Sequence, residues 1–522
     1  MEKAQSGAEA LVRSLISGGV TTCFANPGTS EMHFVAALDR IPGIRCIPGL
    51  QENTVTGMAD GYFRVLGRPA ATLLHCGPGL ANGIANLHNA RRAESGVVNI
   101  TGDHALAHVK YDSPLTSDIA ALAGASSDWL RISSSADEIG ADAAHAISQA
   151  GAGVGHGRVA TLVLPADVSW GEGGREAPAG AAAPQPLNPP DAGRIDSAVT
   201  ALRSGEPCVI VLGTAALTVA SQPLAAAISD ATGAPLKASG MVAVQPRGRG
   251  RLDIAPVPYP VDLALAALEP FTRVITIGCP MPTAFFLYPG KPSLVTRPDA
   301  SHIALAGRDE DCQAGLEALA AARDAEPAPL PVPPVTPFAQ PEGAITAEGF
   351  AETVCGLIPE NAIVVNEALT LGTGFPARAG RTAPCDWLHI TGGAIGGGIP
   401  VATGAAVAAR GCRVITLQAD GSAAYTMQAL WTQAREGLDC LTLILNNRSY
   451  AILVGEYAKV GAEPGPTAMN MLSLDRPGID WVGLAASLGV AGEAVMTLGT
   501  LRGAMQGALG RKGPYLIDVR FA

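Results

Sequence analysis

The sequence predicts an α/β fold made of three consecutive domains, each built around a parallel β-sheet. The chain has 522 residues, which exceeds the size of one ordinary domain. Short apolar runs alternate with helical patterns along it, as is typical of parallel sheets covered by helices. Two stretches rich in Pro, Gly and Ala interrupt this alternation and are expected to be linkers, at residues 171–192 and 324–343. The predicted domains therefore span residues 1–170, 193–323 and 344–522.

The first block carries five apolar runs that are expected to form buried strands. These runs are residues 21–25, 44–50, 71–76, 97–102 and 160–165. Between the second and third runs, Val55, Met58, Ala59 and Tyr62 keep the spacing of one helix face. A strand followed by a helix and then a strand is the repeating unit of a parallel sheet.

The second and third blocks repeat the pattern after each linker. The expected strands are residues 208–213 and 274–278 in the second block, and 362–366, 413–418, 441–445 and 515–519 in the third. The linker between these two blocks holds seven prolines, which favour an extended spacer.

Composition and charge exclude several classes of function. Charged residues make up 16% of the chain and the net charge is −11, which argues against a surface for nucleic acid or an anionic membrane. The ten cysteines lie singly without a C-x-x-C pair, so neither a cysteine-rich zinc site nor a disulfide framework is expected. The first residues lack the pattern of a signal peptide, and no run of about 18 apolar residues predicts a membrane span. A cytoplasmic enzyme is expected.

Polar residues follow two neighbouring apolar runs of the third block. Asp420, Gly421 and Ser422 follow the run at 413–418, and Asn447 follows the run at 441–445. The carboxyl ends of parallel strands meet at one edge of the sheet, where open α/β folds bind ligands. Oxygen ligands suit Mg²⁺, and a helix N-terminus after Gly421 favours an anion. Taken singly, each segment also fits an ordinary turn.

Together the two segments resemble the G-D-G…N-N motif of thiamine diphosphate enzymes, since Asn447 follows Asp420 by 27 residues. The resemblance assigns Asp420, the Asn447 side chain and the Ser449 carbonyl to Mg²⁺, and it places Gly421 and Ser422 at the cofactor. The first glycine of the motif is Ala419 here. Its methyl group is expected to weaken cofactor binding without abolishing it.

The Gly-rich segment 391–400 resembles the loop that lies beneath the cofactor in this family. Gly393 belongs to this loop, and Ile395 occupies the position of the bulky residue that props the pyrimidine ring toward the thiazolium. A buried isoleucine in the approach to a helix is the alternative interpretation. Thr370, after the run at 362–366, is a candidate hydroxyl ligand for the diphosphate.

Three candidate catalytic residues lie in the first block. Glu52 stands where a strand gives way to a helix, and with the pattern at 57–62 it matches the carboxylate that these enzymes hold against the pyrimidine. An acid that suits the helix dipole is the simpler interpretation. His75 matches an active-site histidine of benzoylformate decarboxylase-like enzymes, although a core histidine is equally compatible. Thr29, in N-P-G-T-S-E, matches a substrate-facing serine of the same enzymes.

The resemblance covers nearly the whole chain, in the order pyrimidine-binding, central Rossmann-like and diphosphate-binding domain. The sequence resembles both acetolactate synthase large subunits and benzoylformate decarboxylases. Phe285 and Phe286 stand near the position of the decarboxylase's second histidine. They are either core residues or, with Leu453, walls of a substrate pocket. FAD is not expected, because the central block lacks a convincing glycine pattern for it.

The resemblance implies an enzyme that depends on thiamine diphosphate and Mg²⁺ and acts on a 2-oxo acid. Acetolactate synthase-like decarboxylation, with carboligation of the enamine intermediate, is the first hypothesis. Non-oxidative decarboxylation like that of benzoylformate decarboxylase is the alternative, and a non-catalytic partner subunit is a lesser one. In this family Glu52 and the metal ligands meet across a subunit interface, so a homodimer or homotetramer is expected.

Overall fold

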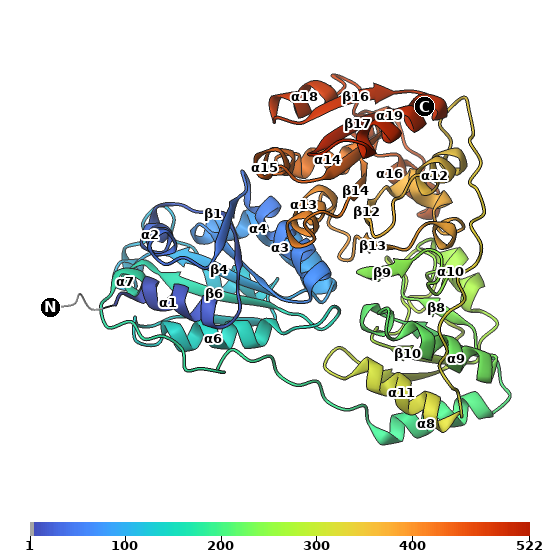
Figure 1. Cartoon of the computed structure of the whole chain (residues 1–522), viewed down its shortest axis with the longest axis horizontal. Coiled ribbons are helices and arrows are strands. Elements are labelled where there is room, and N and C mark those ends of the chain that lie inside the picture. Colours follow the sequence, from blue (N-terminus) through green and yellow to red (C-terminus); the bar gives the residue numbers. More distant parts are fainter. Residues whose placement is uncertain (1–4, 522) are drawn as a thin grey trace.

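Parallel β-sheets form the framework of all three lobes in the computed structural model, which describes residues 5–521 (Figure 1). The first lobe contains a six-stranded sheet in the order β2-β1-β3-β4-β6-β5, and every pair of neighbours is parallel. Its strands are β1 (Thr22–Asn26), β2 (Arg45–Pro48), β3 (Ala70–Leu74), β4 (Val97–Asp103), β5 (Trp129–Ile132) and β6 (Val159–Pro165).

Helices cover both faces of this first sheet. The core on one face includes α1 (Gly7–Ser17), α2 (Met32–Arg40), α6 (Ile139–Ala150) and α7 (Ala166–Trp170). The core on the other face includes α3 (Glu52–Leu66), α4 (Cys76–Arg92) and α5 (Ile119–Gly124). Two short 3₁₀ turns, η1 (Thr29–Glu31) and η2 (Val109–Tyr111), follow β1 and β4.

The second lobe contains a four-stranded parallel sheet in the order β11-β10-β7-β8. Its strands are β7 (Cys208–Leu212), β8 (Leu236–Ala238), β10 (Arg273–Ile277) and β11 (Ser301–Ala306). Its other elements are α8 (Ala192–Arg203), η3 (Thr214–Ala216), α9 (Gln222–Thr232), α10 (Val261–Leu268) and α11 (Cys312–Ala322).

The third lobe contains a seven-stranded sheet in the order β16-β17-β15-β14-β12-β13-β9. Its strands are β12 (Ile363–Glu367), β13 (Cys385–His389), β14 (Val414–Ala419), β15 (Cys440–Asn446), β16 (Ala491–Val495), β17 (Tyr515–Arg520) and β9 (Val244–Arg247). Its helices are α12 (Ala347–Cys355), α13 (Gly398–Ala408), α14 (Asp420–Thr426), α15 (Ala429–Glu436), α16 (Ala451–Lys459), α17 (Pro466–Leu472), α18 (Trp481–Ser487) and α19 (Leu498–Leu509), with the 3₁₀ turns η4 (Leu369–Gly374) and η5 (Ala379–Arg381).

Strand β9 belongs by sequence to the predicted central domain, yet it pairs antiparallel with β13 at the edge of the third sheet. The third sheet is therefore mostly rather than wholly parallel. Pro246 lies within β9, and an edge strand tolerates proline because one side of it makes no ladder hydrogen bonds. The described chain has no helix or strand between α7 and α8 or between α11 and α12, where the two linkers were predicted.

Helices α3 and α13 join the first lobe to the third, near the centre of the view in Figure 1. Glycines allow the two backbones to approach closely. A Cβ atom on Gly61 would lie 2.0 Å from the Val401 carbonyl oxygen, and one on Gly404 would lie 1.8 Å from that of Met58. The buried Arg64 guanidinium pairs with Asp60 and also donates to the carbonyl of His389 on β13 (2.6 Å). The lobes are thus held by close packing and by a satisfied buried charge.

None of the helices within residues 5–521 has the length and apolar character that crossing a membrane requires.

Candidate active site

A cavity of about 360 Å³ opens at the carboxyl ends of β14 and β15 in the third lobe. Its size lies within the usual range of small-molecule sites, about 300–1,000 Å³. Predicted site residues from four separate segments line it: Thr370, Ile395, Asp420, Gly421, Ser422, Asn447, Ser449 and Leu453. The structure therefore brings these residues together around one space, at the sheet edge that the parallel topology predicts.

Asp420 is the buried acid of this cavity, with 3% of its surface exposed. It begins α14, and its carboxylate accepts hydrogen bonds from the backbone N–H groups of Gly421 (2.9 Å) and Arg448 (2.7 Å). Burial raises the pKa of the Asp420 carboxyl, while these two N–H groups act in the opposite direction. Among residues 5–521, no lysine, arginine or histidine pairs with it. A cation bound at Asp420 would compensate its buried charge.

The turn after β15 carries the other oxygen atoms of the site. Arg448 has a left-handed backbone (φ 56°), which turns the chain back toward Asp420. The Asn447 side-chain oxygen accepts the Ser449 N–H (3.0 Å). A carboxylate, a carboxamide and a carbonyl are the hard oxygen donors that Mg²⁺ prefers, especially beside phosphate groups. The residues present therefore fit a magnesium–diphosphate group.

Glu367 is a site residue that the sequence analysis missed. It lies at the end of β12 with 2% of its surface exposed, and burial raises the pKa of its carboxyl. The carboxylate accepts hydrogen bonds from the backbone N–H groups of Gly396 (2.7 Å) and Gly398 (2.6 Å), which closely follow Ile395 in the Gly-rich segment. Glu367 thus holds the Gly-rich loop in place. A signal was available, because Glu367 ends an apolar strand two residues beyond Val365.

Replacing Glu367 with Gln is expected to loosen this loop. Glutamine offers one acceptor oxygen, so one of the two glycine N–H groups loses its partner, which costs about 1–3 kcal/mol for a buried donor. The free energy of unfolding and the affinity for thiamine diphosphate should both fall, as measured by urea unfolding and calorimetry. Glu317→Gln, at an exposed acid on α11, is the matched control. If the two variants have the same free energy of unfolding and the same affinity for thiamine diphosphate, the positioning role of Glu367 is contradicted.

Phe285 extends the site toward the second lobe. A Cβ atom on Gly393 would lie 2.5 Å from the Phe285 ring, so the ring rests directly on the Gly-rich loop. Phe285 stacks edge-on with Phe286 (4.9 Å between ring centres), and the two residues are 39% and 57% exposed. These fractions exclude a core position. Neither ring lines the 360 Å³ cavity, so a role as pocket walls stays a prediction.

Helix α16 closes the cavity on the side of Leu453, and the second lobe holds this helix in place. The Tyr288 hydroxyl donates to the Glu456 carboxylate on α16 (2.8 Å). The Lys459 ammonium, also on α16, lies 5.5 Å from the Tyr259 ring centre. The second lobe therefore influences the position of the cavity wall.

Glu52 is the first residue of α3, after the Gln51 cap, and its carboxylate is half-buried. One carboxylate oxygen accepts from the Asn82 amide (3.1 Å), and the other lies beside Gly79, where an added Cβ would approach to 3.2 Å. This geometry leaves the Glu52 carboxylate available to a further donor at the surface of the first lobe.

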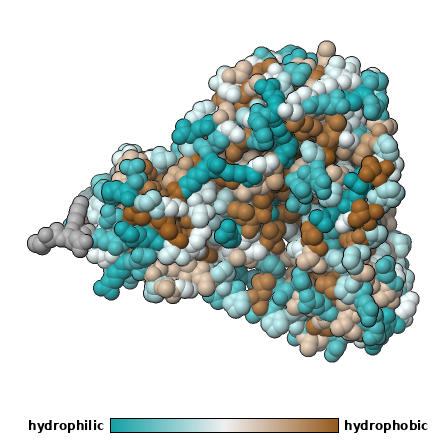
Figure 2. All heavy atoms as spheres, in the orientation of Figure 1, coloured by the Kyte–Doolittle hydropathy of each residue, from teal (hydrophilic) through white to brown (hydrophobic). Residues whose placement is uncertain are grey.

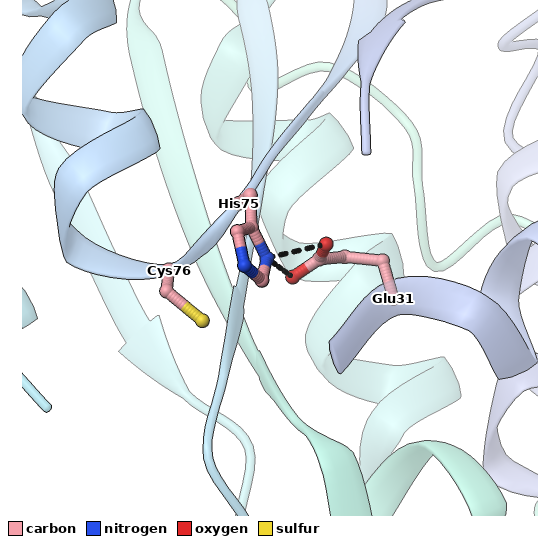
Figure 3. A group of neighbouring side chains, drawn as sticks. All are labelled: Glu31, His75 and Cys76. Carbon is pink, nitrogen blue, oxygen red and sulfur yellow. Dashed lines mark hydrogen bonds and ion pairs between the residues drawn. The ribbon is translucent and has the colours of Figure 1, made fainter. Parts of the chain in front are cut away.

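His75 lies at the end of β3, beside a buried carboxylate that the sequence analysis did not single out (Figure 3). The Nδ1 atom of His75 lies 2.9 Å from Oε2 of Glu31, which is fully buried. The Ser30 hydroxyl lies 3.2 Å from the same Nδ1. Thr29, the predicted residue of this turn, is exposed, and its neighbours Ser30 and Glu31 make the contacts with His75. The role of Thr29 stays a prediction.

Two groups of predicted residues therefore remain separate within one chain. Glu52, His75 and Thr29 belong to the first lobe, and none of them lines the cavity that holds Asp420. Glu52 and His75 are near each other, because both lie beside Gly79 on α4.

Two family models match separate parts of the chain. The family model described as Thiamine pyrophosphate enzyme, N-terminal TPP binding domain matches residues 5–124, and that described as Thiamine pyrophosphate enzyme, C-terminal TPP binding domain matches residues 373–519. A Mycobacterium tuberculosis protein named as a candidate acetolactate synthase large subunit, IlvX, is 45% identical over 98% of both chains. A Pseudomonas aeruginosa benzoylformate decarboxylase is 28% identical over 96% of both chains.

A solved structure shares the whole fold. The Rhodococcus jostii thiamine diphosphate-dependent 4-hydroxybenzoylformate decarboxylase superposes with a TM-score of 0.83 over 99% of both chains, at 24% sequence identity. The two family matches, the similarity over the whole length and the arrangement of the cavity lead to one conclusion. The chain belongs to the thiamine pyrophosphate-dependent enzyme family, together with proteins named as acetolactate synthase large subunits and benzoylformate decarboxylases.

Proposed function

We propose that this protein decarboxylates a 2-oxo acid with thiamine diphosphate and Mg²⁺. The observation that carries the proposal is the pairing of two features: a cavity with buried oxygen donors around Asp420, and a His75 imidazole held by the buried Glu31 carboxylate. The similarity to a benzoylformate decarboxylase over 96% of both chains supports the same reaction.

The residues of the third lobe would bind and orient the cofactor. Asp420, Asn447 and Ser449 would hold Mg²⁺ and with it the diphosphate, at the N-terminus of α14. Glu367 fixes the loop that carries Ile395, and Ile395 would support the rings from below. When bound, the cofactor supplies the electron sink that makes loss of CO₂ possible.

The residues of the first lobe would handle protons. The Glu52 carboxylate would hold a proton against the pyrimidine ring. His75 would give a proton to the reacting carbon or orient the substrate carboxylate, since an imidazole within reach of a carboxylate is well suited to proton transfer. Glu31 fixes the orientation of the His75 ring by accepting at Nδ1.

The separation of the two groups supports a homodimer or homotetramer in which the first lobe of one subunit covers the cavity of another. Exposed apolar side chains flank both groups: Leu50, two residues before Glu52, is 50% exposed, and Met471, on the cavity wall, is 67% exposed. Figure 2 shows apolar residues at the surface where the lobes come together. Contact between subunits would bury such residues.

Replacing His75 with Ala tests the proposed reaction. Over a panel of aliphatic and aromatic 2-oxo acids, we expect CO₂ release by the wild type with at least one of them. We expect aldehyde formation to fall by about 10²–10⁴-fold in the variant, the usual contribution of an acid–base group. His145→Ala, at an exposed histidine on α6, is the matched control. If the wild type is saturated with thiamine diphosphate and releases no CO₂ from any substrate, a non-catalytic homologue is favoured. The departure from the family motif at Ala419 is the reason for considering that alternative.

Carboligation, as in an acetolactate synthase, is the second candidate. Phe285 and Phe286 favour it, because apolar rings beside the Gly-rich loop could exclude water and receive an acceptor carbonyl compound. The name of the relative that is 45% identical also supports it. Measuring acyloin and aldehyde in the same assay separates the two reactions. Acyloin as the main product would mean that the enzyme catalyses carboligation and not decarboxylation alone.

A further inference from the structure

The first lobe contains a compact cluster of three residues of different chemistry: Glu31, His75 and Cys76 (Figure 3). Each offers one ligand atom, and these atoms all lie within 4.8 Å of one another. The cluster is formed by the turn after β1 and the junction of β3 with α4. Glu31 and Cys76 are buried, and the His75 side chain is 23% exposed, so the group reaches the surface through His75.

The Glu31 carboxylate lacks a permanent counter-charge. Its side chain is fully buried, and among residues 5–521 its one ion-pair partner is His75, which is charged only when protonated. The Gly28 N–H (2.7 Å) and the Ser30 hydroxyl are its other partners. A buried carboxylate is stable when it is paired with a cation or coordinates a metal.

Cys76 has an unusual backbone. Its φ of 50° lies in the left-handed region, which a cysteine rarely adopts. Such backbone strain is commonly retained where it serves a site. The Cys76 thiol is buried, and its Sγ lies 3.1 Å from the Ser30 hydroxyl oxygen. Burial raises the pKa of this thiol to about 11, which argues against a free thiolate nucleophile.

Glycines bring the surrounding backbone close to the cluster. A Cβ atom on Gly28 would lie 2.3 Å from the His75 ring, and one on Gly102 would lie 1.6 Å from a carboxylate oxygen of Glu31. The two side chains are therefore confined, and their positions relative to Cys76 are held by the backbone. This confinement is what a metal site needs, because ligands that are already in place lose little freedom on binding.

We propose that Glu31, His75 and Cys76 bind a zinc ion, with one carboxylate oxygen, the imidazole Nδ1 and the thiolate as ligands. Three protein ligands leave the fourth tetrahedral position open to water or substrate. The Ser30 hydroxyl now lies within hydrogen-bond distance of all three residues, so it must turn aside or become the fourth ligand. The thiol proton leaves to solvent as the sulfur coordinates, and the proton that Nδ1 shares with Glu31 moves through solvent to Nε2, so that Nδ1 is free to bind the metal. The absence of a C-x-x-C pair from the sequence does not exclude this site, because it has one carboxylate, one imidazole and one thiolate ligand. The fold brings these three ligands together from separate parts of the chain.

Zinc bound here should inhibit the enzyme, and this consequence rests on the proposed function. An imidazole whose Nδ1 coordinates a metal cannot take up a second proton. His75 could then no longer transfer a proton to the reacting carbon. The binding itself does not depend on that role.

Cobalt is the probe for binding, because a thiolate bound to Co²⁺ gives a near-ultraviolet charge-transfer band that oxygen ligands do not give. With the full chain saturated with thiamine diphosphate and Mg²⁺, we expect one Co²⁺ per chain to produce this band and Zn²⁺ to displace it. In Cys76→Ser the band should vanish and zinc affinity should fall more than about 100-fold, since loss of a mere supporting partner costs 10–100-fold. Cys46→Ser, at an exposed cysteine, is the matched control.

Absence of the band in the wild type, or its persistence in Cys76→Ser, would overturn the site. If Cys76→Ser does not fold, X-ray absorption of the zinc-loaded wild type decides instead: we expect one sulfur in the zinc shell, and a shell without sulfur would refute the proposal. The effect of zinc on turnover is measured in a separate assay. Inhibition by zinc that a chelator reverses supports the role of His75, whereas binding without inhibition leaves the metal site standing and removes that role.

Discussion

Replacing Asp420 with Ala is expected to abolish binding of thiamine diphosphate while leaving the fold intact. The carboxylate is the one buried anion among the cavity residues, and its partners are the backbone N–H groups of Gly421 and Arg448. Without it, a magnesium ion loses its charged ligand and the diphosphate loses the metal that joins it to the protein. Since loss of a supporting partner alone weakens metal sites 10–100-fold, we expect more than about 100-fold here.

Calorimetric titration of Asp420→Ala with thiamine diphosphate and Mg²⁺ measures this effect. Asp420→Asn keeps the shape of the side chain and separates loss of charge from loss of packing. Asp230→Ala, at an exposed acid on α9, is the matched control for removal of a carboxylate elsewhere. Circular dichroism should show the same secondary structure in all variants. If Asp420→Ala binds the cofactor as tightly as the wild type, Asp420 is only the first residue of α14 and the metal assignment is wrong.

Replacing Glu52 with Gln is expected to slow turnover strongly while cofactor binding is retained. Glutamine is nearly isosteric, and its side-chain oxygen can still accept from the Asn82 amide. It cannot give and recover a proton, however, and this is the role proposed for Glu52 against the pyrimidine ring. Loss of one acid–base group typically slows the dependent step by about 10²–10⁴-fold.

Hydrogen–deuterium exchange at C2 of the bound cofactor, followed by quenched NMR, measures this step directly. Steady-state turnover should fall in parallel. Glu138→Gln, at an exposed acid of the same lobe, is the matched control. Exchange in Glu52→Gln at the wild-type rate would mean that Glu52 serves only the N-terminus of α3. Because Glu52 and Asp420 lie in different lobes, the two variants should separate activation of the cofactor from its binding.

Strands that carry a continuous apolar segment were predictable from the sequence. Every apolar run assigned to a strand overlaps one in the structure, because a fully buried strand needs a continuous apolar segment. The strands that were missed lack this signal. Six strands were missed: β5, β11 and β16 are mostly not fully buried, β8 has three residues, β9 contains a proline, and Asp386 and His389 interrupt the apolar residues of β13. Their strand geometry comes from pairing with neighbours, so local hydrophobicity does not reveal it.

The residues of the candidate site also divide into those that local sequence patterns predict and those that they do not. Asp420 and Asn447 were predictable as neighbours, because both directly follow buried strands and parallel strands end at one edge. The buried partners of the predicted residues were not. Glu31 lies beside His75 from 44 positions away, and Glu367 holds Gly396 and Gly398 from 29 and 31 positions away. Glu31 is an acidic residue in a turn, which carries no local mark of burial, and the position of Glu367 at a strand end does not reveal which N–H groups it holds.

The sequence by itself therefore determined the α/β class, the order of the buried strands and the residues that follow them, since these depend on local patterns of apolar and polar residues. Only the tertiary structure decided which side chains meet. It placed β9 on the third sheet, seated Phe285 on Gly393 and buried Glu31 between His75 and the backbone of Gly102. Such contacts join segments far apart in the chain, and close packing of whole lobes selects them rather than any spacing along the sequence.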